Sequence, residues 1–197
     1  MKFLGHVSFA AFLLSSVACG GGAASGSGPA NQATTTQASA SAGDSTLPKP
    51  ADHPESDKVS WKADGKSCHP NTKAVDLVAG VTAIANGCVD TKAMHQVGQP
   101  TTGQGAASTA TMVQTIPLKG QANHCYRVFG LADPTVTDFD IAIMDSAGKS
   151  IGEDLTDSND AIVLENGSFC FKQDDTANVN TAVAAGTGKW AVEIWSN

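Results

Sequence analysis

Short runs of alternating apolar and polar residues fill the C-terminal half of the chain, separated by turn residues about every 8–12 positions. This alternation is typical of antiparallel strands with one buried face. The predicted strands are 112–118, 125–131, 139–144, 150–154, 161–165, 168–173, 179–184 and 190–195. With no helical period between them, they predict a mainly β fold, a two-sheet sandwich rather than a closed barrel.

A helical period precedes these strands. The apolar residues that recur at three- and four-residue spacing are Ala74, Leu77, Val78, Val81 and Ala85. Asn71-Thr72 suit the N-cap, Asn86-Gly87 suit the C-terminal stop, and Gly80 weakens the helix between them. The sequence around this helix predicts an irregular chain, with a loop from Gly98 to Ser108. We therefore expect a small helical and irregular subdomain at 59–110 and a β-sandwich domain at 111–197.

The N-terminus has the layout of a signal peptide over residues 1–18. Lys2 supplies the positive start, and the apolar stretch 3–14 is too short to span a membrane. The small residues that follow end in Ser16-Val17-Ala18-Cys19, which resembles the lipobox of bacterial lipoproteins, with serine where leucine is usual. The resemblance implies cleavage before Cys19 and lipidation of Cys19 by diacylglycerol and acyl chains such as palmitate. Several chains would anchor the protein without spanning the membrane.

The segment 19–58 is expected to be the lipidated cysteine followed by a disordered linker. It is rich in Gly, Ala, Ser, Thr and Pro, with one leucine and no aromatic residue. Such a composition buries too little apolar surface to offset the entropy of ordering. A flexible tether of this length spans roughly 35 Å on average.

Charge limits the partners. Of the 12 Lys and Arg residues, removal of Lys2 leaves 11 against 19 Asp and Glu, a net charge of −8. Without clustered Lys and Arg, neither nucleic acid nor an acidic lipid surface is an expected partner. We expect contact with a membrane through the N-terminal lipid, and with an envelope protein or polysaccharide. The expected location is the cell envelope, at the outer membrane.

Four cysteines follow Cys19, and an even number in an exported chain implies disulfides. Cys125 and Cys170 each lie in a predicted strand and are expected to bond, which leaves Cys68 with Cys88. A helix over 72–86 is about 22 Å long, and the chain from Cys68 to its start reaches about 13 Å. Since bonded Cα atoms lie within about 7 Å, either the helix breaks at Gly80 or the bonds cross between the two parts.

The run HCYRVFGLADPTVTDFDIAIMDSAGKSIGEDLTDSNDAIV, with the later SFCF and GTGKWAVEIW, resembles the β-sandwich of bacterial pre-peptidase C-terminal domains. It is closer still to envelope lipoproteins typical of myxobacteria. The shared features are a CYxV strand, an aspartate-bearing hairpin, Asp154 after it, and a final aromatic strand behind a GxG turn. The resemblance covers roughly 116–195 and implies a jelly-roll-like sandwich, an accessory module without catalytic residues.

Acidic residues are the one candidate for metal binding. They are Asp133, Asp138, Asp140, Asp145, Glu153, Asp154, Asp157 and Asp160. Ca²⁺ prefers six to eight oxygen ligands, so loops that brought these acids together would suit a cation. If they lie along separate edges they are only solvated. The second arrangement is expected, and we assign no metal ligand and no cofactor.

No catalytic set stands out. His53, His69, His95 and His124 lack zinc-enzyme spacing, and the serines lack a nucleophile motif. The aromatic residues Trp61, Tyr126, Phe129, Trp190 and Trp195 suit either a sugar-binding platform or, as expected here, a core. Trp190 and Trp195 should face opposite sides of a strand, one in the core and one partly exposed.

The function expected from the sequence is a non-catalytic binding or scaffolding role at the envelope. The alternatives are an envelope hydrolase built from scattered Asp, His and Ser residues, and a structural lipoprotein that contacts peptidoglycan or another outer-membrane protein. Convergence of polar groups in one deep pocket would favour the hydrolase.

Overall fold

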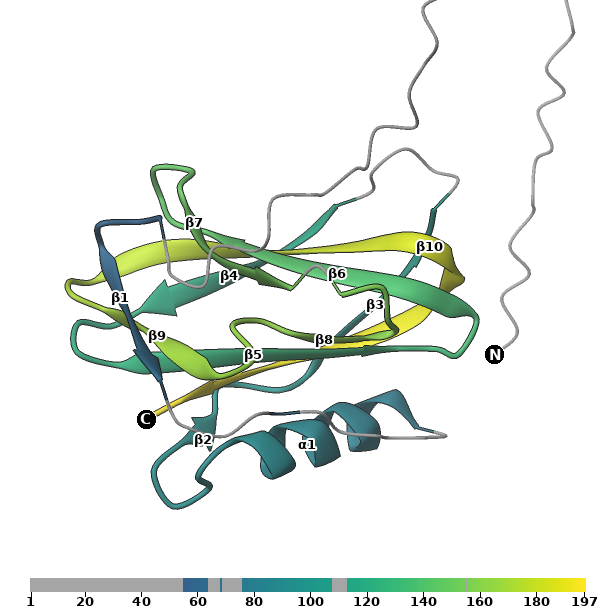
Figure 1. Cartoon of the computed structure of the whole chain (residues 1–197), viewed down its shortest axis with the longest axis horizontal. Helices are drawn as coiled ribbons and strands as arrows, with labels where there is room; N and C mark the ends of the chain where they lie inside the picture. Colours follow the sequence, from purple (N-terminus) through teal and green to yellow (C-terminus); the bar gives the residue numbers. More distant parts are fainter. Residues whose placement is uncertain (1–54, 64–67, 69–75, 108–112, 155) are drawn as a thin grey trace, which may run out of the picture. The chain divides into compact units, whose positions relative to one another are not determined.

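The computed structural model describes residues 55–63, 68, 76–107, 113–154 and 156–197, and its fold is mainly β (Figure 1). The elements are β1 (Val59–Ala63), α1 (Leu77–Cys88), β2 (His95–Gln96), β3 (Thr101–Ala106), β4 (Gln114–Gly120), β5 (Cys125–Ala132), β6 (Val136–Met144), β7 (Ser150–Asp154), β8 (Asp160–Ile162), β9 (Gly167–Phe171) and β10 (Asp175–Ser196). They form two antiparallel sheets that share one core, which confirms the predicted sandwich. The predicted signal peptide 1–18, Cys19 and the predicted linker up to residue 54 lie outside the described residues.

Strand β10 is central in both sheets. Its first part lies between β4 and β6, and β7 pairs with the other side of β6. Its second part lies between β5 on one side and β3 and β2 on the other. Beyond β5 come β8 and β9, and β1 pairs with β9. The two strands predicted at 179–184 and 190–195 are therefore one strand that passes from one sheet to the other.

A glycine permits this passage. The register of β10 against β6 shifts on both sides of Ala185, and Gly186 has a φ of +91°. A Cβ there would clash with the backbone oxygen of Thr135 and lie 2.8 Å from Cα of Val136. Bulges of this kind bend a strand and increase its twist, which redirects β10 towards the second sheet.

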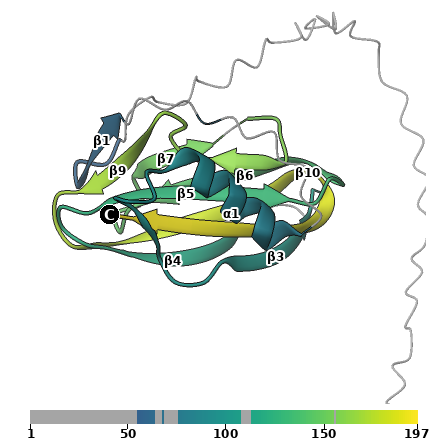
Figure 2. The ribbon, with the colours of Figure 1, turned by 90° about the horizontal axis from the view of Figure 1, so that it is seen from below.

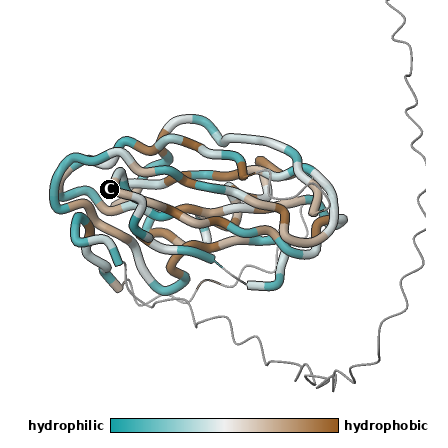
Figure 3. Tube along the Cα trace, turned by 90° about the horizontal axis from the view of Figure 1, so that it is seen from above, coloured by the Kyte–Doolittle hydropathy of each residue, from teal (hydrophilic) through white to brown (hydrophobic). Residues whose placement is uncertain are grey.

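The main core lies between the two sheets. Phe139, Ile141 and Ile143 alternate along β6 and are fully buried, and Trp190 stacks on Phe139 with 5.7 Å between ring centroids. Figure 3 shows hydrophobic segments along the middle of the strands and hydrophilic ones towards their ends. Burial of each such side chain contributes about 1.5–3 kcal/mol.

A second core lies on the outer face of the sheet that contains β5 and the end of β10. Helix α1 lies across this face (Figure 2), and Val81 and Ile84 pack there with Leu131 and Trp195. Trp190 and Trp195 do face opposite sides, but Trp195 is only 7% exposed because α1 covers it. The expectation that one of the two is partly exposed is wrong.

The helix begins and ends later than expected. Asp76 is the N-cap, its carboxylate accepting the N–H of Ala79 at 2.8 Å, and α1 continues past Gly80 and Gly87 to Cys88. Asn71 and Thr72 lie outside the described residues. Gly87 lies within the helix, so the expected stop at Asn86-Gly87 is wrong.

Two disulfides link the four cysteines. Cys125 and Cys170 are direct partners across β5 and β9, with Cα atoms 3.8 Å apart, as expected. Cys68 and Cys88 pair with Cα atoms 5.3 Å apart. Neither a break at Gly80 nor a bond between the two parts is needed. Because α1 begins only after Asp76, the chain from Cys68 is long enough, at about 3.4 Å per residue, to cover a helix of about 18 Å.

The described strands before residue 110 pair with strands that follow it. Strand β1 pairs with β9, and strands β2 and β3 pair with β10. β3 occupies most of the stretch 98–108 that is predicted to be a loop. The described strands on both sides of residue 110 therefore pair with one another.

Buried polar groups join α1 to the sheet beneath it. Arg127 donates from Nη1 to the carbonyl of Cys88 at 2.8 Å and from Nη2 to the carbonyl of Glu165 at 2.9 Å. Glu193, only 1% exposed, accepts hydrogen bonds from the Thr82 hydroxyl and from the Trp195 indole N–H. Since unpaired buried charges are costly, these bonds help to fix the helix at one position on the sheet.

Candidate binding site

Among the described strands, β3 pairs with β10 alone. Just after β3, the backbone N–H of Ala107 donates to the carbonyl of Gly186 at 3.0 Å. In the ladder that continues from this pair, the odd-numbered residues of β3 direct their backbone N–H and C=O groups towards β10. In a regular antiparallel ladder the even-numbered residues Thr102 and Gln104 then direct their backbone groups away from β10. The hydrogen bond from Nε2 of Gln114 to the carbonyl of Gln104, at 2.7 Å, agrees with this direction.

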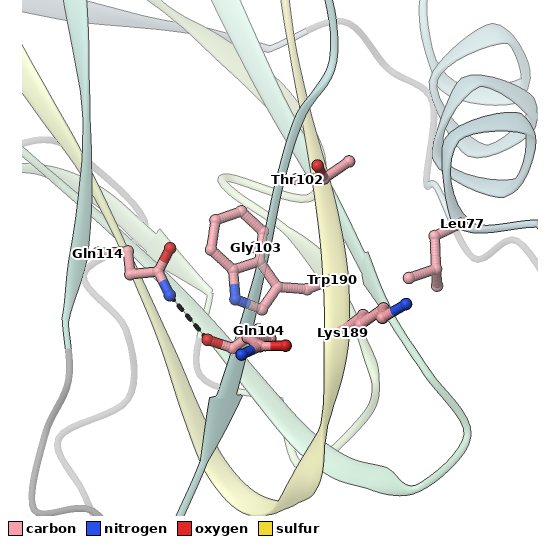
Figure 4. Close-up of a pocket in the computed structure, with 7 residues that line it drawn as sticks. All are labelled: Leu77, Thr102, Gly103, Gln104, Gln114, Lys189 and Trp190. Atoms are coloured by element: carbon pink, nitrogen blue, oxygen red, sulfur yellow. Dashed lines mark hydrogen bonds between the residues drawn. The ribbon is translucent and has the colours of Figure 1, made fainter. Parts of the chain in front are cut away.

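A hollow of about 520 Å³ lies beside β3 (Figure 4). It is lined by Leu77 of α1, Thr102, Gly103 and Gln104 of β3, Gln114 of β4, and Lys189 and Trp190 of β10. The volume lies within the range of small-molecule and peptide sites. The lining joins two apolar side chains with two carboxamides, a hydroxyl and an ammonium group.

Glycine allows β3 to lie against Trp190. A Cβ at Gly103 would overlap the indole ring of Trp190, and one at Gly105 would lie 2.9 Å from Cγ2 of Val183. Both glycines face inwards, so Thr102 and Gln104 face outwards and are exposed. Trp190 is only 2% exposed: it lines the hollow, while its indole ring stacks on Phe139 in the core.

The lining of the hollow offers hydrogen-bonding groups and one charge. Its described lining residues include no carboxylate, imidazole, thiol or serine hydroxyl, and Lys189 is their single charged group. The predicted Asp, His and Ser residues therefore do not converge there. The arrangement suits a ligand that offers hydrogen-bond donors and acceptors together with a negative charge.

The predicted acidic residues fall into two sets. Asp133 and Asp145 lie apart: Asp133 accepts the N–H of Lys189 at 2.8 Å, and Asp145 accepts the Ser56 hydroxyl at 2.6 Å. Burial alone would raise the pKa of Asp145, but hydrogen bonds from Ser56, Lys149 and Ala147 and the nearby charge of Lys58 lower it below its usual value.

Several of the remaining acids affect one another's pKa. Burial and, after it, the charges of Asp138, Asp157 and Glu153 together raise the pKa of Asp140 to about 6. Burial and the charge of Asp157 also raise the pKa of Asp138. The acids of β6, β7 and the following segment therefore share one negative field.

Asp154 is the most buried of these carboxyls, at 7% exposed. Its pKa is raised to about 7, mainly by burial and to a lesser extent by the charges of Asp140 and Asp160, against hydrogen bonds from the Thr156 hydroxyl and the Ile162 N–H that lower it. Within the part of the chain that the structure describes, no three His, Cys, Asp or Glu side chains have the arrangement of a metal site.

The aromatic and histidine candidates have structural surroundings. Tyr126, Phe129, Trp190 and Trp195 are buried in the two cores, so they form no exposed sugar-binding platform, and Trp61 is half-buried. Nδ1 of His124 lies 2.5 Å from the carbonyl oxygen of Asn197. His95 lies in β2, and His53 and His69 lie outside the described residues.

Sequence reasoning missed the hollow because it read β3 as a loop. The run TTGQGA has neither large apolar residues nor clear alternation. The absence of proline leaves a strand possible, but no pattern in the run marks it as a strand.

No protein-family model and no curated protein matches the chain. Among the described residues, no helix is long and apolar enough to cross a membrane.

Proposed function

We propose that this protein is a lipid-anchored, non-catalytic binding module of the bacterial cell envelope. The observation that carries the binding role is the hollow beside β3, where carboxamide, hydroxyl, ammonium and strand backbone groups meet at an exposed edge. Such groups hold a ligand by hydrogen bonds and one ion pair.

The anchor rests on the lipobox-like Ser16-Val17-Ala18-Cys19 and the signal-peptide layout before it. The flexible composition of 20–57 would let the sandwich stand roughly 35 Å from the bilayer. The two disulfides support export, since such bonds persist in oxidising compartments. Together these features favour an outer-membrane lipoprotein whose sandwich contacts an envelope protein or polysaccharide.

A hydrolase has less support. Asp140 and Asp154 have pKa values near neutrality, as a general acid needs. Neither lines the hollow, and Asp154 is directed into the core.

The anchor is tested by changing Cys19 in cells that make the full precursor. Cys19→Ala should move the protein from the membrane fraction to the soluble fraction or leave an uncut precursor. A globomycin-type inhibitor of lipoprotein signal peptidase should make the native chain accumulate uncut. Ser16→Leu, which restores the usual lipobox residue, is the matched control and should be processed and retained like the native chain. Normal processing and membrane retention of Cys19→Ala would refute the anchor.

A further inference from the structure

The free edge of β3 differs from the other edges of the sandwich. Among the described residues, β1, β2, β4, β7 and β8 also pair with one strand only; β2 is just two residues long, and β8 contains Asp160. β1 contains Lys62, β4 contains Pro117 and Lys119, and β7 contains Glu153 and Asp154. Charges and proline on an edge strand oppose pairing with another chain. β3, with the sequence TTGQGA, has neither.

The backbone of this edge is directed at the hollow. The N–H and C=O of Thr102 and the N–H of Gln104 point away from β10, as argued above. The Gln104 carbonyl is held by the amide of Gln114, a donor of the kind that a neighbouring strand would supply. A strand added to an edge lies about 4.8 Å from it, and the hollow beside β3 leaves room for one.

Charge narrows the choice of occupant. Lys189 is directly opposite Gln104, is exposed, and brings the single positive charge of the described lining into a protein of net charge −7. Its ammonium takes part in no ion pair among the described residues. A second copy of this acidic chain would be repelled, whereas a neutral strand with one carboxylate would pair with Lys189.

We propose that the β3 edge binds an extended peptide segment of a partner protein by strand addition, with an acidic side chain of that segment on Lys189. Main-chain hydrogen bonds to Thr102 and Gln104 would provide affinity, and Lys189 with Leu77 would provide selectivity. The inference rests on the proposed binding function and names the class of its partner.

The test uses the purified full chain in detergent and a phage-displayed library of random heptapeptides. Gln104→Pro removes an N–H that β10 does not use, so the sheet should persist while strand addition is blocked. Thr115→Pro is the matched control: it makes the same change at an outward position of β4, two residues from Pro117. Lys189→Glu reverses the charge of the hollow.

We expect enriched peptides that carry Asp or Glu, bind native protein and Thr115→Pro equally, and bind Gln104→Pro at least about tenfold more weakly, as loss of one or two hydrogen bonds implies. Lys189→Glu should weaken acidic peptides and favour basic ones. Peptide binding should also slow amide hydrogen exchange at Thr102 and Gln104 in the native protein, a readout that holds even if Gln104→Pro misfolds.

Three results would overturn the proposal. The enriched peptides could bind Gln104→Pro as tightly as the Thr115→Pro control, or they could lack acidic residues. Sedimentation could instead show that the native chain dimerises through this edge. Because the assay uses detergent-solubilised protein, its outcome is independent of whether Cys19 carries a lipid.

Discussion

Asp154 reaches the core because β7 contains one extra residue. Ser150 is opposite Met144 and Gly152 is opposite Ile143, so Ile151 is inserted into the ladder. The shift places Asp154 opposite Ile141, on the inward face; without it, Asp154 would face outwards beside Asp140. The bounds of β7 could be predicted from its alternation, but a single-residue bulge reverses every later side chain and has no reliable signal in the sequence.

Replacing this carboxyl should stabilise the protein at neutral pH. The folded pKa of Asp154, about 7, exceeds the unfolded value of 3.8. Its contribution to stability is therefore fully present below about pH 4 and is lost as the pH rises to about 7. Asp154→Asn should match the native protein near pH 4 and unfold with a free energy higher by up to about 4 kcal/mol at pH 8, measured by urea denaturation, since each pKa unit corresponds to about 1.4 kcal/mol.

Asp175 should behave in the opposite way and is the control. Burial would raise its pKa, but hydrogen bonds from Ser146 and Lys58, with which it forms an ion pair at 3.1 Å, lower it. The contribution of the Asp175 charge to stability is present above the unfolded pKa and is lost as the pH falls through the lower, folded pKa. Asp175→Asn should therefore destabilise the protein at pH 8. A pH-independent effect of Asp154→Asn would contradict the assigned burial of its charge.

At the scale of elements, hydrophobic periodicity predicts where most strands lie. It does not predict that two of them join into β10, or that β3 is a strand. The predicted strand 150–154 coincides with β7, and 125–131 lies within β5. β10 was divided in two because residues 185–189 contain glycine and threonine, which in a linear sequence resemble a turn. β3 was missed because glycines replace its inward side chains, and the reason for those glycines, Trp190, lies 87 residues away.

Alanine substitutions at two glycines test where α1 ends. A Cβ at Gly87 or at Gly148 would meet nothing within 4 Å, but only Gly148 has a positive φ, +76°. Because Gly87 lies in the helix, Gly87→Ala should stabilise by about 0.5–1 kcal/mol. Gly148→Ala, in the turn before β7, should destabilise by about 1 kcal/mol. Thermal denaturation compares the two, and destabilisation by Gly87→Ala would restore the helix stop expected from the sequence.

At the scale of the whole molecule, the fold class and the Cys125–Cys170 pair follow from sequence patterns, but the position of α1 does not. Amphipathic spacing indicates a helix with one buried face and does not say which sheet covers it. The buried Trp195 and the Arg127 and Glu193 hydrogen bonds depend on that tertiary choice. The hollow depends on it as well, since Leu77 of α1 lines it beside β3.

The central claim, a binding module held at the envelope by an acylated cysteine, is tested most directly by the mass of its mature N-terminus. The native protein would be extracted from membranes and digested, and the N-terminal peptide analysed by mass spectrometry. The account predicts a peptide that begins at Cys19 and has the added mass of diacylglycerol. A mature chain that begins at another residue, or an unmodified Cys19, would contradict it.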